Sequence, residues 1–288
     1  MPHPDLHLHP LHPLTGLCRR ITLVVVGWLA ACAPAFDPGT QFREDIPARA
    51  KVDGVPLIQQ AAYYCGPTSL AMVMQWAGAD VTPDAIADLA FSPAARGTYL
   101  ADMIGSSRRL GQLAVRINSF DQLLSEIDAS HPVIVFQNLG FGFAPVWHYG
   151  VVTGYDFDRD EVYLNSGQRE QMVMPFAVFE RTWARGEYWG LVVLPPDDLP
   201  VSVSQNDILS GGAALERVGQ FEAAATLYET GAARWPENWL WSFGLANARY
   251  GLGDLHGARD ALLQARAIEP MIPEIKANLR QVEQELRG

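Results

Sequence analysis

The sequence predicts an α+β domain followed by an all-α domain, on three observations. Helical segments come first, between residues 66 and 127, and apolar strand-like segments follow between 133 and 194, an order typical of α+β folds. A polar, proline-rich stretch at 195–204 then marks a boundary. Beyond that stretch the pattern is helical and repeats every 34 residues.

The composition indicates a globular protein that does not bind nucleic acid. The chain has 288 residues, of which 49% are hydrophobic, so it can bury the core of an enzyme-sized domain and of a smaller second one. Its formal net charge is -11, and it has no Lys/Arg-rich run that could displace counterions from a phosphate backbone. We expect no nucleic-acid partner, no cofactor and no metal site.

Residues 1–31 are typical of a signal peptide. Arg19 and Arg20 precede an apolar run at 21–31, which is too short to span a bilayer because a spanning helix needs about 20 apolar residues. The run ends in the sequence LAAC, which stops at Cys32 and resembles a bacterial lipobox. In a lipobox the signal is cut before the cysteine, and the thiol carries lipid. The alternatives are an ordinary cleaved signal and an uncleaved anchor.

The same features predict a lipoprotein of the bacterial cell envelope. With lipid on Cys32, the segment 32–51, rich in Pro, Asp and small residues, would be a tether from the membrane surface. Ala33 in place of Asp resembles the pattern of outer-membrane lipoproteins, so we expect a periplasm-facing chain at the outer membrane. Cys18 would be lost with the signal, which leaves Cys65 as the free thiol in an oxidising compartment.

Local signals place Cys65 at the start of a predicted helix. The segment 66–77 has Pro67 in its first turn and apolar residues at helical spacing, after a short strand-like segment at 55–58. Further helices are predicted near 83–89, 100–110 and 120–127, with Thr82 and Ser119 as N-caps and with Ser119 and Gln122 as a capping box. Strands are predicted at 133–137, 148–155, 161–164, 171–174 and 188–194.

Cys65 is the candidate nucleophile, because a helix N-terminus stabilises the thiolate form in which cysteine attacks. A cysteine nucleophile needs a base, and near neutral pH that base is most often histidine. His131 stands at the entry to a strand, and His256 lies in the repeat region. His148 begins an apolar strand directly after a Gly/aromatic loop at 139–147, so it is the candidate base.

Three short sequences around these residues resemble a known family. Gln59 stands six residues before the sequence CGPTSLAM that begins at Cys65; HYGVV begins at His148, and VYLN ends at Asn165. Together they resemble the bacteriocin-processing (double-glycine) cysteine peptidases of the papain-like clan, over residues 52–194. The resemblance implies helices packed on an antiparallel sheet. It also implies Cys65 as nucleophile, His148 as base and Gln59 as oxyanion donor, although the donor assignment could shift by one to the adjacent Gln60.

The residue that orients the histidine departs from the family pattern. Where the family usually has Asp followed by Pro, this chain has Ser166-Gly167, and the nearest carboxamide is Asn165. An Asn can orient a catalytic His. A shift of one residue on a strand nevertheless turns the side chain to the other face. We therefore predict a Cys65–His148–Asn165 site, with Ser166 or a backbone carbonyl as the alternative orienting group and an impaired enzyme as a further alternative.

Residues 205–288 resemble tetratricopeptide repeats. Small residues allow the two helices of such a repeat to approach, and proline ends the second helix. Gly211 and Arg249 stand where a Leu and a Tyr are usual, and 272–286 is predicted as a capping helix. An unrelated helical hairpin bundle is the alternative. Three residues recur after 34 positions: Gly219, Ala224 and Pro236 as Gly253, Ala258 and Pro270.

The predicted function is that of a membrane-anchored cysteine peptidase, with repeats that bind a protein partner. The family resemblance implies a peptide or protein substrate with small residues before the cleaved bond. One alternative is a catalytically degenerate peptide-binding or scaffold lipoprotein, and another is a Cys-dependent acyl transferase or amidase. The repeats could also be the main functional part. Structurally, Cys65 and His148 could each be ordinary buried residues.

Overall fold

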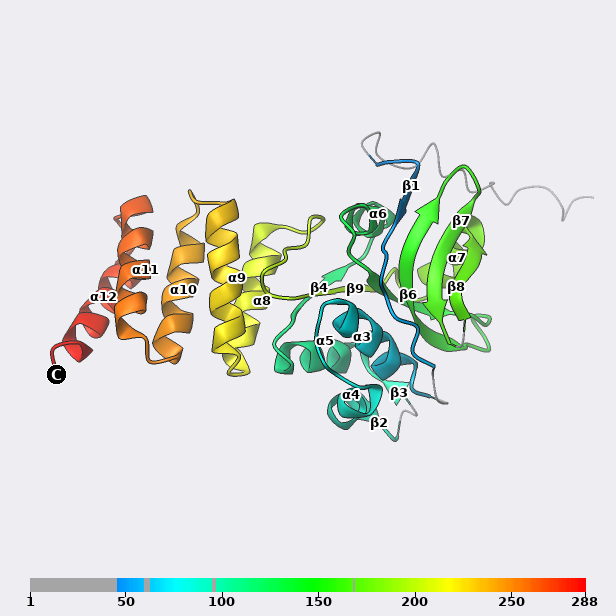
Figure 1. Ribbon diagram of the computed structural model, residues 1–288, viewed down its shortest axis with the longest axis horizontal. Helices are drawn as coiled ribbons and strands as arrows, with labels where there is room; N and C mark the ends of the chain where they lie inside the picture. Colours follow the sequence, from blue (N-terminus) through cyan, green and yellow to red (C-terminus); the bar gives the residue numbers. More distant parts are fainter. Residues whose placement is uncertain (1–45, 60–62, 95–96, 168) are drawn as a thin grey trace, which may run out of the picture. The chain divides into compact units, whose positions relative to one another are not determined.

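The structure, a computed structural model, describes residues 46–59, 63–94, 97–167 and 169–288. The predicted signal peptide, the lipid attachment site at Cys32, most of the tether and Gln60 lie outside these residues. The described chain belongs to one compact unit within Asp37–Gly288. A twisted sheet with helices against it is followed by a series of helices (Figure 1). Within these ranges no helix has both the length and the apolar character needed to cross a membrane.

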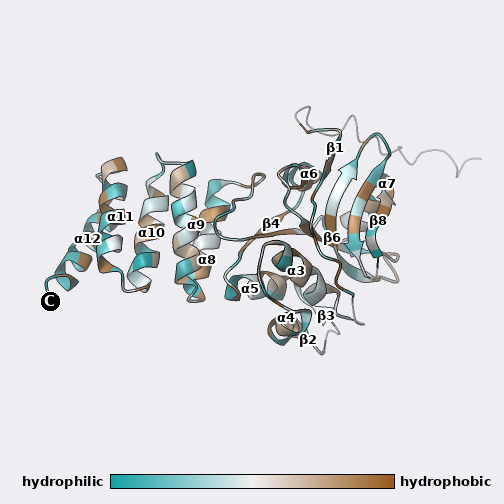
Figure 2. Cartoon of the chain, viewed as in Figure 1, coloured by the Kyte–Doolittle hydropathy of each residue, from teal (hydrophilic) through white to brown (hydrophobic). Residues whose placement is uncertain are grey.

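An antiparallel sheet forms the centre of the N-terminal part. The strand order is β4-β9-β5-β6-β7-β8, and β1 pairs with the end of β6. β4 and β9 consist largely of hydrophobic residues (Figure 2), because nearly all of their side chains are buried, on both faces of the sheet. The strands are β1 (Arg49–Lys51), β4 (Leu113–Ile117), β5 (Val133–Asn138), β6 (Trp147–Asp156), β7 (Glu161–Ser166), β8 (Arg169–Pro175) and β9 (Gly190–Leu194), with a separate pair β2 (Phe91–Ser92) and β3 (Gly97–Thr98).

The helices of this part begin close to where the sequence predicts. α3 is the central one, since nine consecutive residues at its N-terminal end, 66–74, are buried and the helix packs against β6. The Thr82 side chain accepts the N–H of Ala85, and Ser119 accepts that of Gln122, so both predicted N-caps are confirmed. The helices are α3 (Cys65–Trp76), α4 (Pro83–Ala90), α5 (Leu100–Arg109), α6 (Phe120–Asp128) and α7 (Phe176–Ala184).

Three local predictions were wrong. The segment 55–58 is irregular chain and not a strand. The sheet does not follow all the helices, because β4 lies between α5 and α6 and α7 lies between β8 and β9. β4 has only five residues, and four of them are buried, so it lacks the alternation that would indicate a strand in the sequence. In the predicted capping box, the Gln122 carboxamide accepts the N–H of Asn118, one residue before the cap.

The C-terminal helices follow the period that the sequence predicts. α10 and α11 begin and end 34 residues after α8 and α9, and α12 has the same offset from α10. Gly219 and Gly253 take the same left-handed conformation, with φ of 78° and 77°, in the turns inside the two pairs. That these repeats are of the tetratricopeptide type stays a prediction. The helices are α8 (Gln205–Arg217), α9 (Phe221–Arg234), α10 (Trp239–Gly251), α11 (Leu255–Ile268) and α12 (Pro273–Glu285).

The first repeat helix shares its core with the sheet. α8 packs against β4, and Leu113 and Val115 of that strand belong to the same buried cluster as the repeat residues. A Cβ on Gly211 would lie 2.5 Å from Leu113 Cδ1. The absence of the usual Leu at Gly211 is therefore explained by the close approach of α8 to β4. The packing continues past the predicted linker, and the division into two domains stays a prediction.

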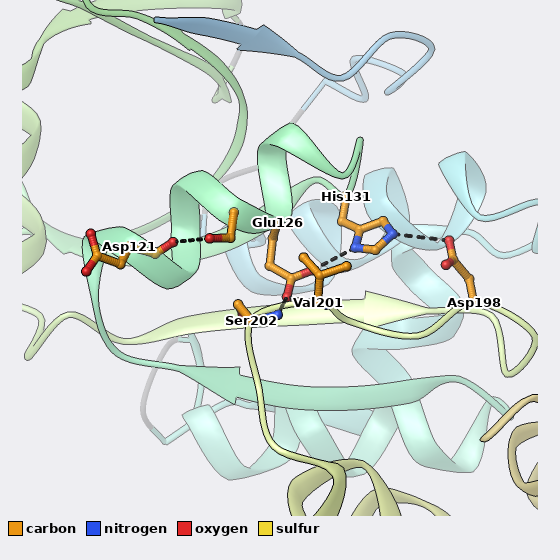
Figure 3. Close-up of polar contacts among 7 residues, drawn as sticks. Asp121, Glu126, His131, Asp198, Val201 and Ser202 are labelled. Atoms are coloured by element: carbon orange, nitrogen blue, oxygen red, sulfur yellow. Dashed lines mark hydrogen bonds and ion pairs between the residues drawn. The ribbon is translucent and has the colours of Figure 1, made fainter. Parts of the chain in front are cut away.

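The predicted linker, 195–204, is bound to the N-terminal part of the chain by a charged cluster of Glu126, His131 and Asp198. His131 Nδ1 lies 2.6 Å from Glu126 Oε2 at the end of α6, and its Nε2 lies 3.3 Å from Asp198 Oδ2 in the linker (Figure 3). The other oxygen of Glu126 accepts the backbone N–H groups of Val201, at 2.9 Å, and Ser202, at 2.7 Å. The side chain of Glu126 has no exposed surface. A buried carboxylate needs such partners, so the cluster fixes the path of the chain into α8.

The stability of the protein should fall as the pH rises toward 10. Burial lowers the pKa of His131, but the hydrogen bonds to Asp198 and Glu126 and the charges of both carboxylates raise it to about 9. An unfolded histidine titrates near 6.5, so this stabilisation is complete below about pH 6.5 and disappears as the pH rises through about 9. Urea unfolding should show a loss on the order of 1–2 kcal/mol between pH 7 and pH 10, because solvent screens the partly exposed Asp198 and reduces the full effect of the shift.

Asp198→Asn provides the control for this pH dependence. It removes one of the two carboxylates and should move the loss to a lower pH than in the wild type. Superimposable pH profiles of the two proteins would show that the cluster does not set the stability.

Gly231 in α9 should be intolerant of a side chain. A Cβ there would lie 2.1 Å from the ring of Trp241, which is fully buried. Gly231→Ala should therefore lower the free energy of unfolding by about 1–3 kcal/mol, measured by urea denaturation. Gly105 in α5 is the matched control, since its Cβ would meet only the flexible end of Arg109 at 3.3 Å. Gly105→Ala should stabilise by about 0.5–1 kcal/mol, and equal effects at both glycines would contradict this account.

Candidate active site

Cys65 is the first residue of α3, as the sequence predicts. It is half-buried, and it is a free cysteine. The N–H groups in the first turn of a helix have no partner within that helix and carry a partial positive charge. The backbone next to Cys65 is tightly packed, because a Cβ on Gly66 would lie 2.8 Å from Thr98 Cβ. The β2–β3 pair therefore covers the start of the helix, and Gly66 makes that approach feasible.

Tyr149 connects this helix start to the strand that carries His148. Its hydroxyl donates to the carbonyl of Thr98 at 3.0 Å. Burial raises the pKa of Tyr149, and the nearby charges of Cys65 and Asp102 raise it further. Tyr149 follows His148 in β6, and α3 packs against that strand. The structure thus brings the segments of Cys65 and His148 together, although within the described residues no hydrogen bond joins the two side chains.

His148 is held by Ser166. Its Nε2 lies 2.8 Å from Ser166 Oγ at the end of β7, and Ser166 is only 8% exposed. Burial lowers the pKa of His148 below its ordinary value, so the imidazole stays neutral at neutral pH. In the tautomer in which Nε2–H donates to Ser166, Nδ1 is left as an acceptor. Nδ1 has no hydrogen-bond partner in the part of the chain that the structure describes, and it is then the atom that can take a proton.

Asn165 serves the backbone and makes no described contact with His148. Its Nδ2 donates to the carbonyl of Val55 at 3.3 Å, and its Oδ1 accepts the N–H of Gln171 at 3.2 Å. Neighbouring side chains on a strand point to opposite faces, so Ser166 and Asn165 cannot both face the imidazole. In the structure, Ser166 makes the contact with His148 that the sequence predicts for Asn165. The sequence offered Ser166 only as an alternative.

Gln59 lies at the end of a described segment. Its side chain is exposed, and residues 60–62, between it and Tyr63, lie outside the described part of the chain. Its role as oxyanion donor stays a prediction.

The site contains features that sequence reasoning did not find. The bond between Tyr149 and Thr98 joins residues far apart in the chain, and no local pattern indicates it. The tight packing at Gly66 was not anticipated either, although a glycine directly after a candidate nucleophile is a signal for close backbone approach. In the described ranges, no group of three or more His, Cys, Asp or Glu side chains is arranged to hold a metal ion.

Comparison with protein families identifies this part of the chain. Residues 52–188 match the model of the Peptidase_C39 like family, a little under half of the chain. This segment is thus similar to the C39-like peptidases, and we call it the C39-like domain. The match includes Cys65, His148 and Ser166 and ends just before β9. The C39-like domain thus carries the helix and strands that form the candidate site.

Several solved structures resemble the C39-like domain. A protein described as a C39-like peptidase from Bacillus anthracis is 20% identical, with a TM-score of 0.43, and the alignment covers 51% of this chain and 98% of that one. A double glycine motif protease from an AMS/PCAT transporter, in complex with the leader peptide, is 22% identical with a TM-score of 0.40, covering 50% and 93%. The peptidase domain of Streptococcus ComA is 20% identical with a TM-score of 0.41, covering 49% and 99%. No curated protein matches the chain.

The imidazole of His148 should titrate at a lower pH than an ordinary histidine. Because burial lowers its pKa, we expect a midpoint below about 6.5 in a ¹H–¹³C NMR titration of the full-length protein. The signal of His131 should titrate near pH 9, far from that of His148. His148→Gln assigns the signal by removing it. A midpoint for His148 at or above that of an unfolded histidine would mean that the imidazole is solvated or paired with a charge.

Proposed function

We propose that the C39-like domain is a cysteine peptidase with Cys65 as nucleophile and His148 as base. The observation that carries the proposal is the 2.8 Å contact between His148 Nε2 and Ser166 Oγ, on strands packed beside the helix that begins at Cys65. When Nε2–H donates in this contact, Nδ1 is the nitrogen left for proton transfer. The burial of His148 supports the role as well, since it favours the neutral form that a base requires.

The proposed reaction is acyl transfer to the thiol and then to water. Cys65 Sγ attacks the peptide carbonyl while its proton passes to His148 Nδ1, and the Cys65 N–H and the Gln59 side chain stabilise the oxyanion. The C–N bond breaks as the imidazolium returns the proton to the leaving amine. His148 then takes a proton from water, which hydrolyses the thioester and restores the thiol. Ser166 is a positioning residue, because it acts through the imidazole.

The substrate and the setting are further parts of the proposal. The match to the Peptidase_C39 like family supports a peptide substrate. The family resemblance implies small residues before the cleaved bond. A lipid anchor at Cys32 would hold the enzyme at the bacterial outer membrane, facing the periplasm, and the repeats would bind a protein partner. The lipobox-like sequence and the 34-residue helical period support these two points.

A second candidate function follows from the chemistry of Ser166. A hydroxyl has no charge, so it stabilises the imidazolium formed during catalysis less than the carboxylate usual in this family. This favours a domain that binds peptides and turns them over slowly.

Peptide cleavage by the full-length protein tests the proposal. With casein-derived peptides and mass spectrometry of new termini, Cys65→Ala should abolish cleavage and Gln59→Ala should lower it by about 10²–10³-fold. Ser166→Ala should lower the rate by about fivefold, since a neutral hydrogen bond is worth about 1 kcal/mol. Ser166→Asp should raise the rate if the missing charge limits turnover.

Asn165→Ala is the matched control for Ser166. It removes two hydrogen bonds to the backbone and should lower the melting temperature. It should not change the midpoint that His148 sets in the pH profile of the cleavage rate. If Asn165 controls that pH dependence and Ser166 does not, the orienting group has been assigned to the wrong residue. Cleavage that persists in Cys65→Ala would overturn the proposed function itself.

A further inference from the structure

An exposed apolar hairpin stands directly before His148. Its segment, 139–147, contains no charged residue. Phe141 is 68% exposed and Phe143 89% exposed, and Trp147 at the base is 49% exposed. Single exposed apolar residues are common on proteins, but a contiguous group of large ones is typical of an interaction site. This hairpin joins the strand of the proposed catalytic base.

The base of the hairpin is fixed before anything binds to it. Asn138 is buried, and its side-chain oxygen accepts the N–H groups of Gly140, at 3.0 Å, and Val146, at 2.9 Å. The guanidinium of Arg185 donates two hydrogen bonds to the carbonyl of Asn138, at 3.1 and 2.8 Å. A surface that is already ordered loses little conformational entropy on binding, so its apolar area can contribute fully to affinity.

The tip of the hairpin is ordered as well. Phe141 and Ala144 exchange backbone hydrogen bonds of 3.1 Å in both directions. The rings of Phe141 and Phe143 are stacked, with centroids 5.6 Å apart and planes at 6°. At the base, Trp147 stacks on Phe136 with a centroid distance of 5.0 Å. Ordered aromatic rings are therefore present from the tip to the residue that precedes His148.

We propose that the hairpin 139–147 is an apolar wall of the substrate site and selects peptides with large apolar side chains near the cleaved bond. The proposal rests on the proposed function, since it takes Cys65 and His148 as the reacting pair. The ligand is a peptide segment because the hairpin leads directly into β6, the strand that carries the proposed catalytic base His148. The hairpin's lack of charge means that apolar side chains, and not ionic ones, are recognised.

Two other occupants fit less well. A stable interface between two copies of the chain uses about 20–30 residues on each side, far more than this hairpin offers. An anionic lipid surface attracts basic segments, whereas this chain has a formal net charge of -11 and the hairpin itself has no Lys or Arg.

Peptidyl vinyl sulfones of two compositions test the selection. Both probes end in Gly-Gly before the electrophile and carry either two leucines or two serines upstream. The full-length wild type should be labelled at Cys65 on the order of tenfold faster by the leucine probe. The double variant Phe141→Ser/Phe143→Ser should lose this preference. Met271→Ser is the matched control, because Met271 is 72% exposed in the repeat region, and it should keep the preference.

Iodoacetamide separates the selection from the chemistry. It is too small to need the hairpin, so the wild type and the double variant should be alkylated at Cys65 at equal rates. A double variant that keeps the tenfold preference, or a wild type that never shows it while iodoacetamide reacts, overturns the hairpin proposal. If alkylation of Cys65 is indifferent to His148→Ala, the proposed function fails instead.

Binding to the Cys65→Ala protein tests the hairpin even when the thiol is inert. Fluorescein-labelled peptides of the same two compositions should bind with a preference for leucine that the added hairpin changes remove. Sedimentation with phosphatidylcholine vesicles provides the opposing outcome. Vesicle binding that depends on Phe141 and Phe143, without any preference among peptides, would make the hairpin a membrane contact and overturn the proposal.

Discussion

The packing of α3 against β6 is the constraint on which the candidate site depends. A helix buried along most of its length cannot shift along its axis without leaving a cavity or a clash. The position of its first residue, Cys65, is therefore set by the apolar residues that follow in the same helix, and the position of His148 is set by the register of β6 against β5 and β7. Core packing thus determines where a nucleophile and a base can meet.

Much of this arrangement could be predicted from the sequence. Helical spacing and Pro67 indicate a helix after Cys65, and an apolar strand after His148 is equally plain, since both signals are local. The orienting residue was not determined in this way. Whether Asn165 or Ser166 faces the imidazole depends on strand register, and register follows from pairing with distant strands. The bond from Tyr149 to Thr98 was inaccessible for the same reason.

In the C-terminal helices, too, one feature could be predicted from the sequence and another could not. Their period was visible because small residues recur wherever helices approach closely, and the structure places Gly219 and Gly253 in equivalent turns. Gly211 looked like a defect in the repeat pattern, yet it is the residue that allows α8 to lie against Leu113. A departure from a repeat consensus can therefore mark a contact with a neighbouring part of the chain. The tryptophans of this region have a similar explanation, since Trp241 is buried and Trp235 stacks on it.

Glu126 connects the linker before α8 firmly to the N-terminal part of the chain. Its carboxylate holds two successive backbone N–H groups of the linker, and the same side chain is paired with His131 at the foot of β5. A force on the repeats, from a bound partner for example, would not simply extend a flexible linker. These hydrogen bonds, and the contact of α8 with β4, would transmit the force to α6 and the central strands. Tension applied far from Cys65 would thus reach the sheet that carries His148.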